Sequence, residues 1–351
     1  MPMTRARGSE VRLVLKPLAR QVIVITGASS GIGLVTARLA AKRGARVVLG
    51  ARNGQALQKL ASEIERAGGE VAYVTVDVGD PADMEQLAAI ATNRFGRIDT
   101  WVNNAGVSIY GLLEETPLED MRQLFQTNFW GIVHGSLAAL PRLKRAGGAL
   151  INLGSVVSDR AVPLQGAYSA SKHAVKGFTD ALRMELEKEG APVSVTLIKP
   201  AAIDTLFTAN AKNLMSAEPS LPPPVYAPEV VAEAILHAAQ HPERDVYCGG
   251  AARVMAAFGH WAPRLMDRYM QATMFGQQQR GPRLRAPDEH SLYVSRADGR
   301  ARRGDPAHVS ETSVYTRMVT TQRSAALAAL GVLAVSGVLW RARRPKRSAR
   351  R

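Results

Sequence analysis

The chain has 351 residues, of which 46% are hydrophobic and 21% charged, enough to bury a full core in one or two domains. Its single cysteine, Cys248, excludes an intramolecular disulfide framework and a cysteine-based zinc cluster, and it favours a reducing, cytoplasmic location. Residues 252–351 carry 19 basic and 6 acidic side chains, whereas residues 1–251 are nearly neutral, so the tail supplies most of the net charge of +15. A neutral body with a basic tail favours an appendage that meets an anionic surface over a protein that binds nucleic acid.

Between residues 20 and 250, short apolar runs alternate with amphipathic stretches, the pattern of a parallel sheet with crossover helices. The runs are continuously apolar, as expected for strands buried on both faces. We therefore predict an α/β fold, a Rossmann-type doubly wound parallel sheet of about seven strands with helices on both faces. The expected strands are Val22–Thr26, Arg46–Gly50, Ala72–Asp77, Thr100–Asn103, Ala149–Leu153, Ser194–Ile198 and Asp245–Cys248. The expected helices are Gly33–Arg43, Gly54–Ala67, Pro81–Phe95, Leu118–Leu143, Ala167–Glu189 and Pro228–Ala239.

Other segments surround or interrupt this predicted catalytic domain of residues 20–250. Residues 1–19 form an N-terminal arm without the apolar run of a secretory signal. The proline-rich Glu218–Pro228 is expected to be a surface loop or the edge of a lid. Residues 251–323 form an extension, expected to be helical over 253–276 and then polar and poorly ordered over 277–323. Trp261, Met266, Tyr269 and Met270 would form an apolar helix face that packs on the body, or that faces a membrane or the substrate channel.

Residues 324–340 (SAALAALGVLAVSGVLW) carry no charge and precede the basic tail 341–351. At 17 residues, the segment is at the lower limit for a membrane-spanning helix, and Trp340 suits an interfacial anchor. A spanning helix would carry the arginine-rich tail across the membrane, against the positive-inside tendency, whereas a helix lying on an anionic surface would not. The sequence predicts a membrane-associating helix and leaves both placements open.

A glycine-rich turn joins the first expected strand to the first expected helix. It runs Thr26-Gly27-Ala28-Ser29-Ser30-Gly31-Ile32-Gly33. Glycines permit a tight turn and close approach of the backbone to a pyrophosphate, which the free N–H groups and the dipole of the helix N-terminus attract. Strand, turn and helix together predict a dinucleotide site at Gly27, Ser29, Ser30, Gly31, Ile32 and Gly33.

The end of the second expected strand indicates which dinucleotide is bound. A site that selects NAD usually places an acid about 20 residues further on, to bind the ribose 2′-hydroxyl. Here the strand ends in Gly50-Ala51-Arg52-Asn53, without an acid. The guanidinium of Arg52 suits a 2′-phosphate by charge and by fork geometry, so we predict NADP(H).

A tyrosine and a lysine are one helical turn apart in the chain. Tyr168 and Lys172 share one face of an expected helix, and Ser155 stands thirteen residues before the tyrosine. A free tyrosine has a pKa of about 10, and a nearby ammonium with a positive nicotinamide would bring the phenolate toward neutral pH. Ser155 could hydrogen-bond a substrate oxygen. No spacing of His, Asp and Glu suggests a metal.

TGASSGIG, Asn103-Asn104-Ala105-Gly106, Ser155 and Tyr168-Ser169-Ala170-Ser171-Lys172 together resemble the motifs of the short-chain dehydrogenase/reductase family. The resemblance implies that Tyr168 is the acid/base, that Lys172 lowers its pKa and binds the nicotinamide ribose, and that Ser155 orients the carbonyl. It implies that Asn128 holds a water of the proton relay. It also implies cofactor contacts for Asp77, Val78, Asn104, Ala105, Gly106, Pro200, Ile203 and Thr205; Ala201 departs from the glycine that usually follows the proline.

These observations predict an NADP(H)-dependent oxidoreductase that interconverts a carbonyl and an alcohol. The substrate pocket is expected between Leu206–Tyr226 and the side chains of Val157, Val162 and Leu164, whose apolar character favours a hydrophobic substrate. A homodimer or tetramer is expected, as the family implies. The alternatives are a membrane-docked NADP-binding scaffold without turnover and a nucleic-acid-binding tail, which the lack of interleaved aromatics disfavours.

Overall fold

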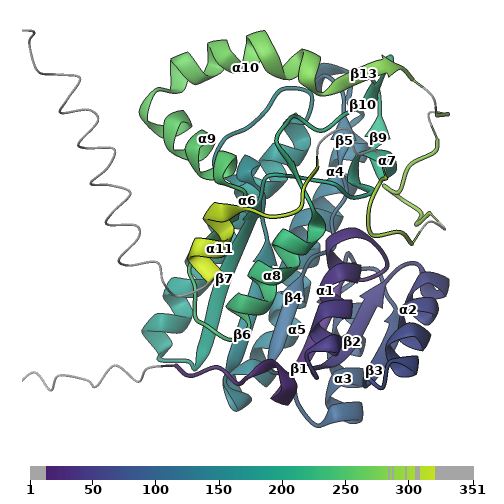
Figure 1. The fold of residues 1–351 in the computed structure, drawn as a ribbon, viewed down its shortest axis with the longest axis vertical. Coiled ribbons are helices and arrows are strands. Elements are labelled where there is room, and N and C mark those ends of the chain that lie inside the picture. Colours follow the sequence, from purple (N-terminus) through teal and green to yellow (C-terminus); the bar gives the residue numbers. More distant parts are fainter. Residues whose placement is uncertain (1–12, 284, 287, 297–298, 305–308, 321–351) are drawn as a thin grey trace, which may run out of the picture.

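The computed structural model describes residues 13–320 except 284, 287, 297–298 and 305–308. Its centre is a parallel sheet of seven strands in the order β12-β7-β6-β4-β1-β2-β3 (Figure 1). The strands are β1 (Val22–Thr26), β2 (Arg46–Ala51), β3 (Val71–Thr75), β4 (Thr100–Asn103), β6 (Gly148–Leu153), β7 (Val193–Pro200) and β12 (Asp245–Cys248). The predicted doubly wound sheet is confirmed, including its seventh strand. The order reverses between β1 and β4, and ligands bind at such switch points.

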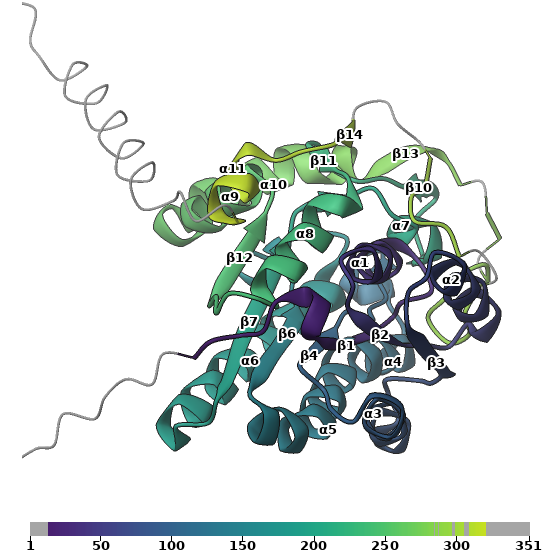
Figure 2. The same ribbon diagram turned by 60° about the horizontal axis from the view of Figure 1, so that its bottom comes forward.

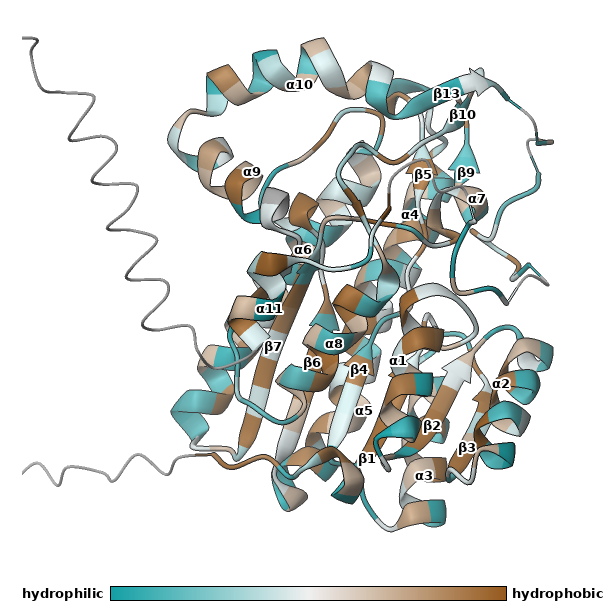
Figure 3. Cartoon of the chain, viewed as in Figure 1, coloured by the Kyte–Doolittle hydropathy of each residue, from teal (hydrophilic) through white to brown (hydrophobic). Residues whose placement is uncertain are grey.

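Helices cover both faces of the sheet, as Figure 2 shows. On one face lie α1 (Gly31–Lys42), α2 (Gly54–Arg66) and α8 (Pro228–Ala238), whose apolar sides pack with the sheet in one buried cluster. On the other lie α3 (Pro81–Phe95), α5 (Gly131–Ala146) and α6 (Gly166–Glu189). Figure 3 shows brown, apolar runs along the strands, whereas α2 alternates hydrophilic and hydrophobic residues because only one side is buried.

The predicted helix Leu118–Leu143 is interrupted. It is resolved into α4 (Leu118–Phe125), a π-helical turn at Gln126–Trp130 and α5. The π turn contains Asn128, which is fully buried and whose side chain bonds both backbone groups of Val107. A π turn admits one extra residue per turn, so it can direct Asn128 inward while α4 and α5 keep their own buried faces.

The extension forms defined structure over the end of the sheet. It includes α9 (Gly250–Trp261) and α10 (Pro263–Gln277), which lie across the top of the molecule in Figure 1. Met266 and Met270 of the expected apolar face are buried, and so is Met274, whereas Trp261 is 84% exposed and Tyr269 is 50% exposed. The prediction was therefore correct for the two methionines and wrong for the two aromatic residues.

Short strands join the extension to the proline-rich loop. β13 (Gln279–Pro282) pairs antiparallel with β10 (Ala217–Pro219), and β14 (Val309–Ser310) pairs with β11 (Val225–Tyr226), which pairs in turn with β8 (Ala202–Ile203). Glu218–Pro228 was expected to be a surface loop or the edge of a lid, and its two ends form these short strands. The described parts of 277–323 carry more regular structure than expected, because backbone pairing needs no apolar pattern in the sequence. The remaining short elements are β5 (Ile109–Tyr110), α7 (Phe207–Asn210), β9 (Lys212–Asn213), α11 (Val314–Thr320) and 3-10 turns at Leu18–Arg20, Leu113–Glu115 and Val156–Ser158.

Within the described residues, no helix is both long and apolar enough to cross a bilayer. The predicted membrane-associating segment 324–340 and the basic tail 341–351 lie outside the described residues, as does most of the N-terminal arm.

Candidate active site

The glycine-rich turn is packed too tightly for side chains. A Cβ on Gly27 would lie 2.7 Å from the Cα of Ala105, and a Cβ on Gly33 would lie 2.4 Å from the carbonyl oxygen of Gly27. The side chain of Asn104 donates to the carbonyls of Thr26 and Gly27 at 2.9 and 3.1 Å. The turn therefore leaves the N-terminus of α1 at the switch point of the sheet, where it can approach a pyrophosphate closely.

A cavity of about 190 Å³ lies beside this turn. Twelve of the predicted cofactor residues line it, namely Gly27, Ser29, Ser30, Gly31, Ile32, Arg52, Asp77, Val78, Asn104, Ala105, Gly106 and Thr205. Tyr168, Lys172, Pro200 and Ile203 instead line a second cavity of about 210 Å³. The two cavities share Ile32, Asn104, Gly106, Thr205 and Phe207 in their linings, so they adjoin. Gly33 lines neither cavity and serves the packing of the turn.

Arg52 has partners that the sequence did not predict. Its Nη2 donates to the carbonyl of Ser291 at 2.6 Å, and its Nη1 donates to the carbonyl of Tyr293 at 2.9 Å and to that of Leu292 at 3.4 Å. Burial lowers the pKa of Arg52, and Asp77 raises it, from 4.0 Å away. Asp77 also accepts from the backbone N–H of Gly79 at 2.9 Å, which is a turn-stabilising contact.

Ser155, Tyr168 and Lys172 line the second cavity, and the Tyr168 ring packs against Phe207, which lines both cavities. A hydrogen bond from Ser155 lowers the pKa of Tyr168, but burial outweighs it and raises that pKa to about 12. The amine of Lys172 donates to the carbonyl of Leu153 at 2.7 Å and lies 5.8 Å from the centre of the Tyr168 ring. Burial lowers the pKa of Lys172 to about 8. The expected lowering of the tyrosine pKa is therefore not produced by the chain alone.

Asn128 lies behind this group. Its Oδ1 accepts from the backbone N–H of Val107 at 2.8 Å, and its Nδ2 donates to the carbonyl of Val107 at 2.9 Å and to Ser171 at 3.2 Å. The side chain thus joins the segment after β4 to α6, the helix that carries Tyr168. Its predicted contact with a relay water stays a prediction.

The second cavity is mostly apolar. Its lining includes the predicted Val157 and Val162, with Phe207 and Leu221–Pro224 from the predicted segment Leu206–Tyr226. It also includes residues that the sequence did not indicate: Tyr110, Met255, Met274 and Gln278. Leu164, predicted to line the pocket, is turned away and packs with Tyr110, Ala211 and Met215, in a left-handed conformation (φ +63°). The spacing of Met266, Met270 and Met274 at i and i+4 was the available signal for a buried helix face here.

The comparisons with known proteins agree with this geometry. The model of the short chain dehydrogenase family matches residues 21–215. The chain belongs to the short-chain dehydrogenase/reductase family. Members of this family are oxidoreductases with nicotinamide dinucleotide cofactors, so the predicted family, fold and oxidoreductase class are confirmed.

The names of the relatives differ in how specific an activity they state. The uncharacterized oxidoreductase YxnA of Bacillus subtilis is 44% identical over 328 residues, covering 93% of this chain and 92% of that protein. The 11-beta-hydroxysteroid dehydrogenase A of Arachis hypogaea is 38% identical over 198 residues, 56% of either chain. YxnA therefore covers most of the extension as well as the sheet, whereas the plant enzyme covers little more than half of the chain.

Two solved structures share the fold. An alcohol dehydrogenase from the archaeon Thermococcus sibiricus, complexed with 5-hydroxy-NADP, has a TM-score of 0.58 at 31% identity and covers 65% of this chain and 95% of that one. A short-chain dehydrogenase/reductase from Burkholderia phymatum, in complex with NAD, has a TM-score of 0.63 at 27% identity and covers 70% of this chain and 94% of that one. One neighbour carries an NADP derivative and the other NAD, so likeness alone leaves the cofactor preference of this chain open.

This chain has Ala201 where family members usually have a glycine after the proline, and the local backbone accommodates the alanine. Its φ is not in the left-handed region that glycine favours, and its N–H donates to the carbonyl of Cys248 at 3.0 Å. An alanine therefore follows Pro200 without strain, and the chain proceeds into β8 with Ile203 beside the second cavity and Thr205 beside both cavities.

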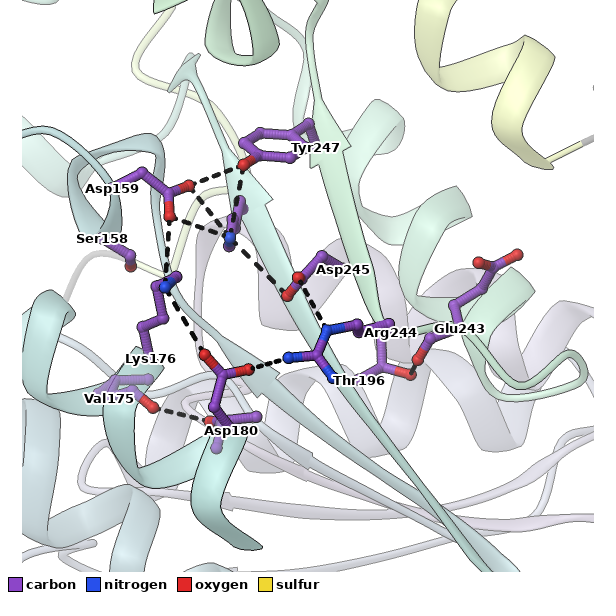
Figure 4. A network of polar contacts seen from close by, with 12 residues as sticks. Ser158, Asp159, Val175, Lys176, Asp180, Thr196, Glu243, Arg244, Asp245 and Tyr247 are labelled. Carbon is purple, nitrogen blue, oxygen red and sulfur yellow. Dashed lines mark hydrogen bonds and ion pairs between the residues drawn. The ribbon is translucent and has the colours of Figure 1, made fainter. Parts of the chain in front are cut away.

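A buried lysine supports the turn that carries Ser155 in this short-chain dehydrogenase/reductase. Lys199 of β7 is 2% exposed and lies 3.0 Å from a carboxylate oxygen of Asp159. Tyr247 of β12 donates to Asp159 at 2.8 Å, and Lys176 and Asp245 continue the network shown in Figure 4. Asp159 directly follows the 3-10 turn capped by Ser155, so the network fixes that turn to β7 and β12. No cluster of three His, Cys, Asp or Glu side chains is placed to hold a metal ion in the described part of the chain.

Proposed function

We propose that this protein is an NADP(H)-dependent oxidoreductase that interconverts a hydrophobic ketone or aldehyde and the corresponding alcohol. The observation that carries the proposal is that a first cavity, next to a helix N-terminus, adjoins a second, mostly apolar cavity lined by Tyr168, Ser155 and Lys172. A dinucleotide in the first cavity and a carbonyl compound in the second would meet at the tyrosine.

The chain's own groups fit a phosphorylated dinucleotide. The N-terminus of α1 borders the cavity and has no side-chain cap from Ser30, and the N–H of Gly31 donates to the carbonyl of Arg300 at 3.1 Å. The end of β2 offers Arg52 rather than a carboxylate. Positive charge at this position favours a 2′-phosphate over a 2′-hydroxyl. When bound, the cofactor would supply the hydride and, in its oxidised form, a positive ring beside Tyr168.

Tyr168 would donate its proton to the carbonyl oxygen during reduction and take it back during oxidation. With a pKa of about 12, the phenol is protonated at neutral pH and ready to donate. Ser155, which hydrogen-bonds Tyr168, would donate to the same oxygen and orient it. Lys172, with its pKa lowered to about 8, remains mostly charged at neutral pH and would stabilise the phenolate formed after proton transfer.

The lining of the second cavity supports a hydrophobic substrate. Val157, Val162, Met255 and Met274 line it, and Phe207 packs edge-on against the Tyr168 ring with 5.2 Å between centroids. Such a wall desolvates an apolar substrate and places few hydrogen-bonding groups away from the reacting carbonyl. Gln165 and Gln278 are polar members of the lining; Gln165 donates to Gln278, which donates to the carbonyl of Pro163.

The direct test is NADPH consumption by the full chain with a panel of aldehydes and ketones of increasing apolar size, with Tyr168→Phe as control. We expect turnover that favours apolar substrates and NADPH over NADH. Binding of NADPH without turnover by the wild-type protein on any carbonyl would contradict the proposal and favour the NADP-binding scaffold.

We also propose a homo-oligomer and a cytoplasmic protein that meets an anionic membrane through residues 324–351. Leu137 of α5 and Met184 of α6 are exposed apolar side chains on the helices expected to pair. Light scattering should give a dimer or tetramer, and Leu137→Glu should shift it toward monomer. Flotation with anionic but not neutral vesicles should recover the full chain; equal recovery with both would contradict the electrostatic part.

A further inference from the structure

One segment of the extension lies against the cofactor cavity, and we call residues 291–296 the clamp segment. After β13 the chain descends beside α2 (Figures 1 and 2). Ser291, Ser295 and Arg296 line the cofactor cavity itself. The carbonyl of Arg296 accepts from the side chain of Asn53 at 2.8 Å, so the clamp segment lies beside the end of β2. None of the family motifs described above includes residues 291–296.

The clamp segment is anchored to the body by buried contacts. Leu292 is fully buried in the same apolar cluster as Tyr168 and Met274. The hydroxyl of Tyr293 donates to Asp120 of α4 at 2.7 Å, and the N–H of Ser291 donates to the carbonyl of Asn210 at 2.8 Å. These contacts tie the clamp segment to α4 and to α7, so Arg52 is not its only attachment to the body.

The clamp segment occupies only part of the Arg52 guanidinium. The carbonyls of Ser291, Leu292 and Tyr293 take hydrogen bonds from Nη1 and Nη2. A guanidinium has five N–H donors in a planar fork, and Nε has no hydrogen-bond partner among the described residues. The edge formed by Nε and the second Nη2 hydrogen is the bidentate edge that matches a phosphate. Three neutral acceptors thus hold the group without cancelling its charge.

We propose that the clamp segment positions Arg52 so that its Nε–Nη2 edge meets the 2′-phosphate, and that the extension thereby sets the preference for NADPH. The inference rests on the proposed NADP(H) function. A long arginine side chain loses considerable rotamer entropy when it binds a ligand, and carbonyl contacts made in advance reduce that cost. The clamp segment is a positioning element, since it acts on the cofactor through Arg52.

Other contacts favour the opposite role, in which the extension obstructs the cofactor cavity. The carbonyl of Arg300 accepts from the N–H of Gly31 at 3.1 Å, and a Cβ on Gly299 would lie 3.2 Å from the carbonyl oxygen of Ser29. The chain therefore crosses the glycine-rich turn as well, and it could obstruct entry of a dinucleotide. Obstruction and positioning predict opposite changes in NADPH affinity. Loosening an obstruction should tighten NADPH binding, whereas loosening a positioning clamp should weaken it.

The experiment measures the dissociation constants of NADPH and NADH for the full chain and for Tyr293→Phe and Leu292→Ala. These variants loosen the hydroxyl anchor and the buried anchor. Val294→Ala is the matched control, because Val294 is in the same segment and is 74% exposed. We expect the NADPH-over-NADH preference to fall several-fold in Tyr293→Phe and by about tenfold in Leu292→Ala, in the range of one charge-assisted hydrogen bond. NADH affinity should stay unchanged, and so should both affinities in the control.

A double-mutant cycle with Arg52→Gln completes the test. In the Arg52→Gln background, Leu292→Ala should cause no further loss of preference, since its effect passes through the guanidinium. Tighter NADPH binding in the anchor variants, or an equal loss of NADPH and NADH affinity, would overturn the positioning role. A wild-type protein that binds NADH as well as NADPH would instead remove the NADP(H) function on which the inference rests.

Discussion

The two adjoining cavities are built in different ways. The cofactor cavity is formed largely by turns at the ends of β1 to β4, with polar groups and close backbone contacts, such as the 2.4 Å that separates a Cβ on Gly33 from Gly27. The proposed substrate cavity combines the proposed catalytic group with apolar side chains from α9, α10 and the proline-rich loop. The difference teaches that, if the proposed function holds, the Rossmann turns bind the cofactor while later segments shape the space beside Tyr168.

The largest expected effect is on the chemistry where the cavities join. Tyr168→Phe removes the proton donor while leaving the ring packed against Phe207, so kcat should fall by about a thousandfold, within the usual contribution of general acid catalysis. The dissociation constant of NADPH, measured by fluorescence titration, should change little. A large loss of NADPH affinity would show that the two cavities are not separable at this residue.

The next effect tests the support of the Ser155 turn. Lys199→Met removes the buried partner of Asp159 and should lower the free energy of unfolding by about 3 kcal/mol, because a partly buried carboxylate loses its main counter-charge. Lys176→Met is the matched control, since Lys176 is 37% exposed and lies 3.9 Å from the same carboxylate, and it should cost under about 0.5 kcal/mol. Urea unfolding gives both values. Equal costs would mean that the buried pair does not support the turn.

A pH effect should follow from Lys172. Its pKa is about 8 in the fold and 10.5 in the unfolded reference, so the unfolded chain binds more protons between these values. The free energy of unfolding of the wild type should therefore rise with pH from about 8 to about 10.5, by roughly 3 kcal/mol. Lys172→Met should abolish that rise, as measured by urea unfolding across the range. A difference between the two proteins that is flat with pH would contradict the lowered pKa.

The smallest expected effect separates recognition from folding on α10. Met274 lines the substrate cavity, whereas Met270 is equally buried but does not. Met274→Ala should raise KM for the best apolar substrate about fivefold, the loss of roughly 1 kcal/mol of apolar contact, with the NADPH dissociation constant unchanged. Met270→Ala should lower the free energy of unfolding about as much as Met274→Ala does, but it should leave KM unchanged. Equal KM values for the two variants would sink the assignment of α10 to the substrate wall.

Much of the cofactor site could be predicted because its signals are local. The glycine spacing after β1, the absence of an acid after Arg52 and the one-turn separation of Tyr168 and Lys172 each lie within a few residues. Parallel strands place such local motifs at one edge of the sheet, so correctly predicted strands bring the candidate site residues together. The π turn at Asn128 was missed because its signal is a contact with Val107 rather than a periodicity.

The amino-acid sequence by itself determined the strands of the sheet, the family and the proposed catalytic residues. Their signals are apolar runs, glycines and helical spacing, which act over short stretches of chain. Only the tertiary structure decided what surrounds them. It brought Ser291 to Arg52 across 239 residues, placed Met274 in the substrate wall, and buried Tyr168 so that desolvation raises its pKa against the help of Ser155. Long-range backbone contacts and desolvation depend on the completed packing, and no local pattern records them.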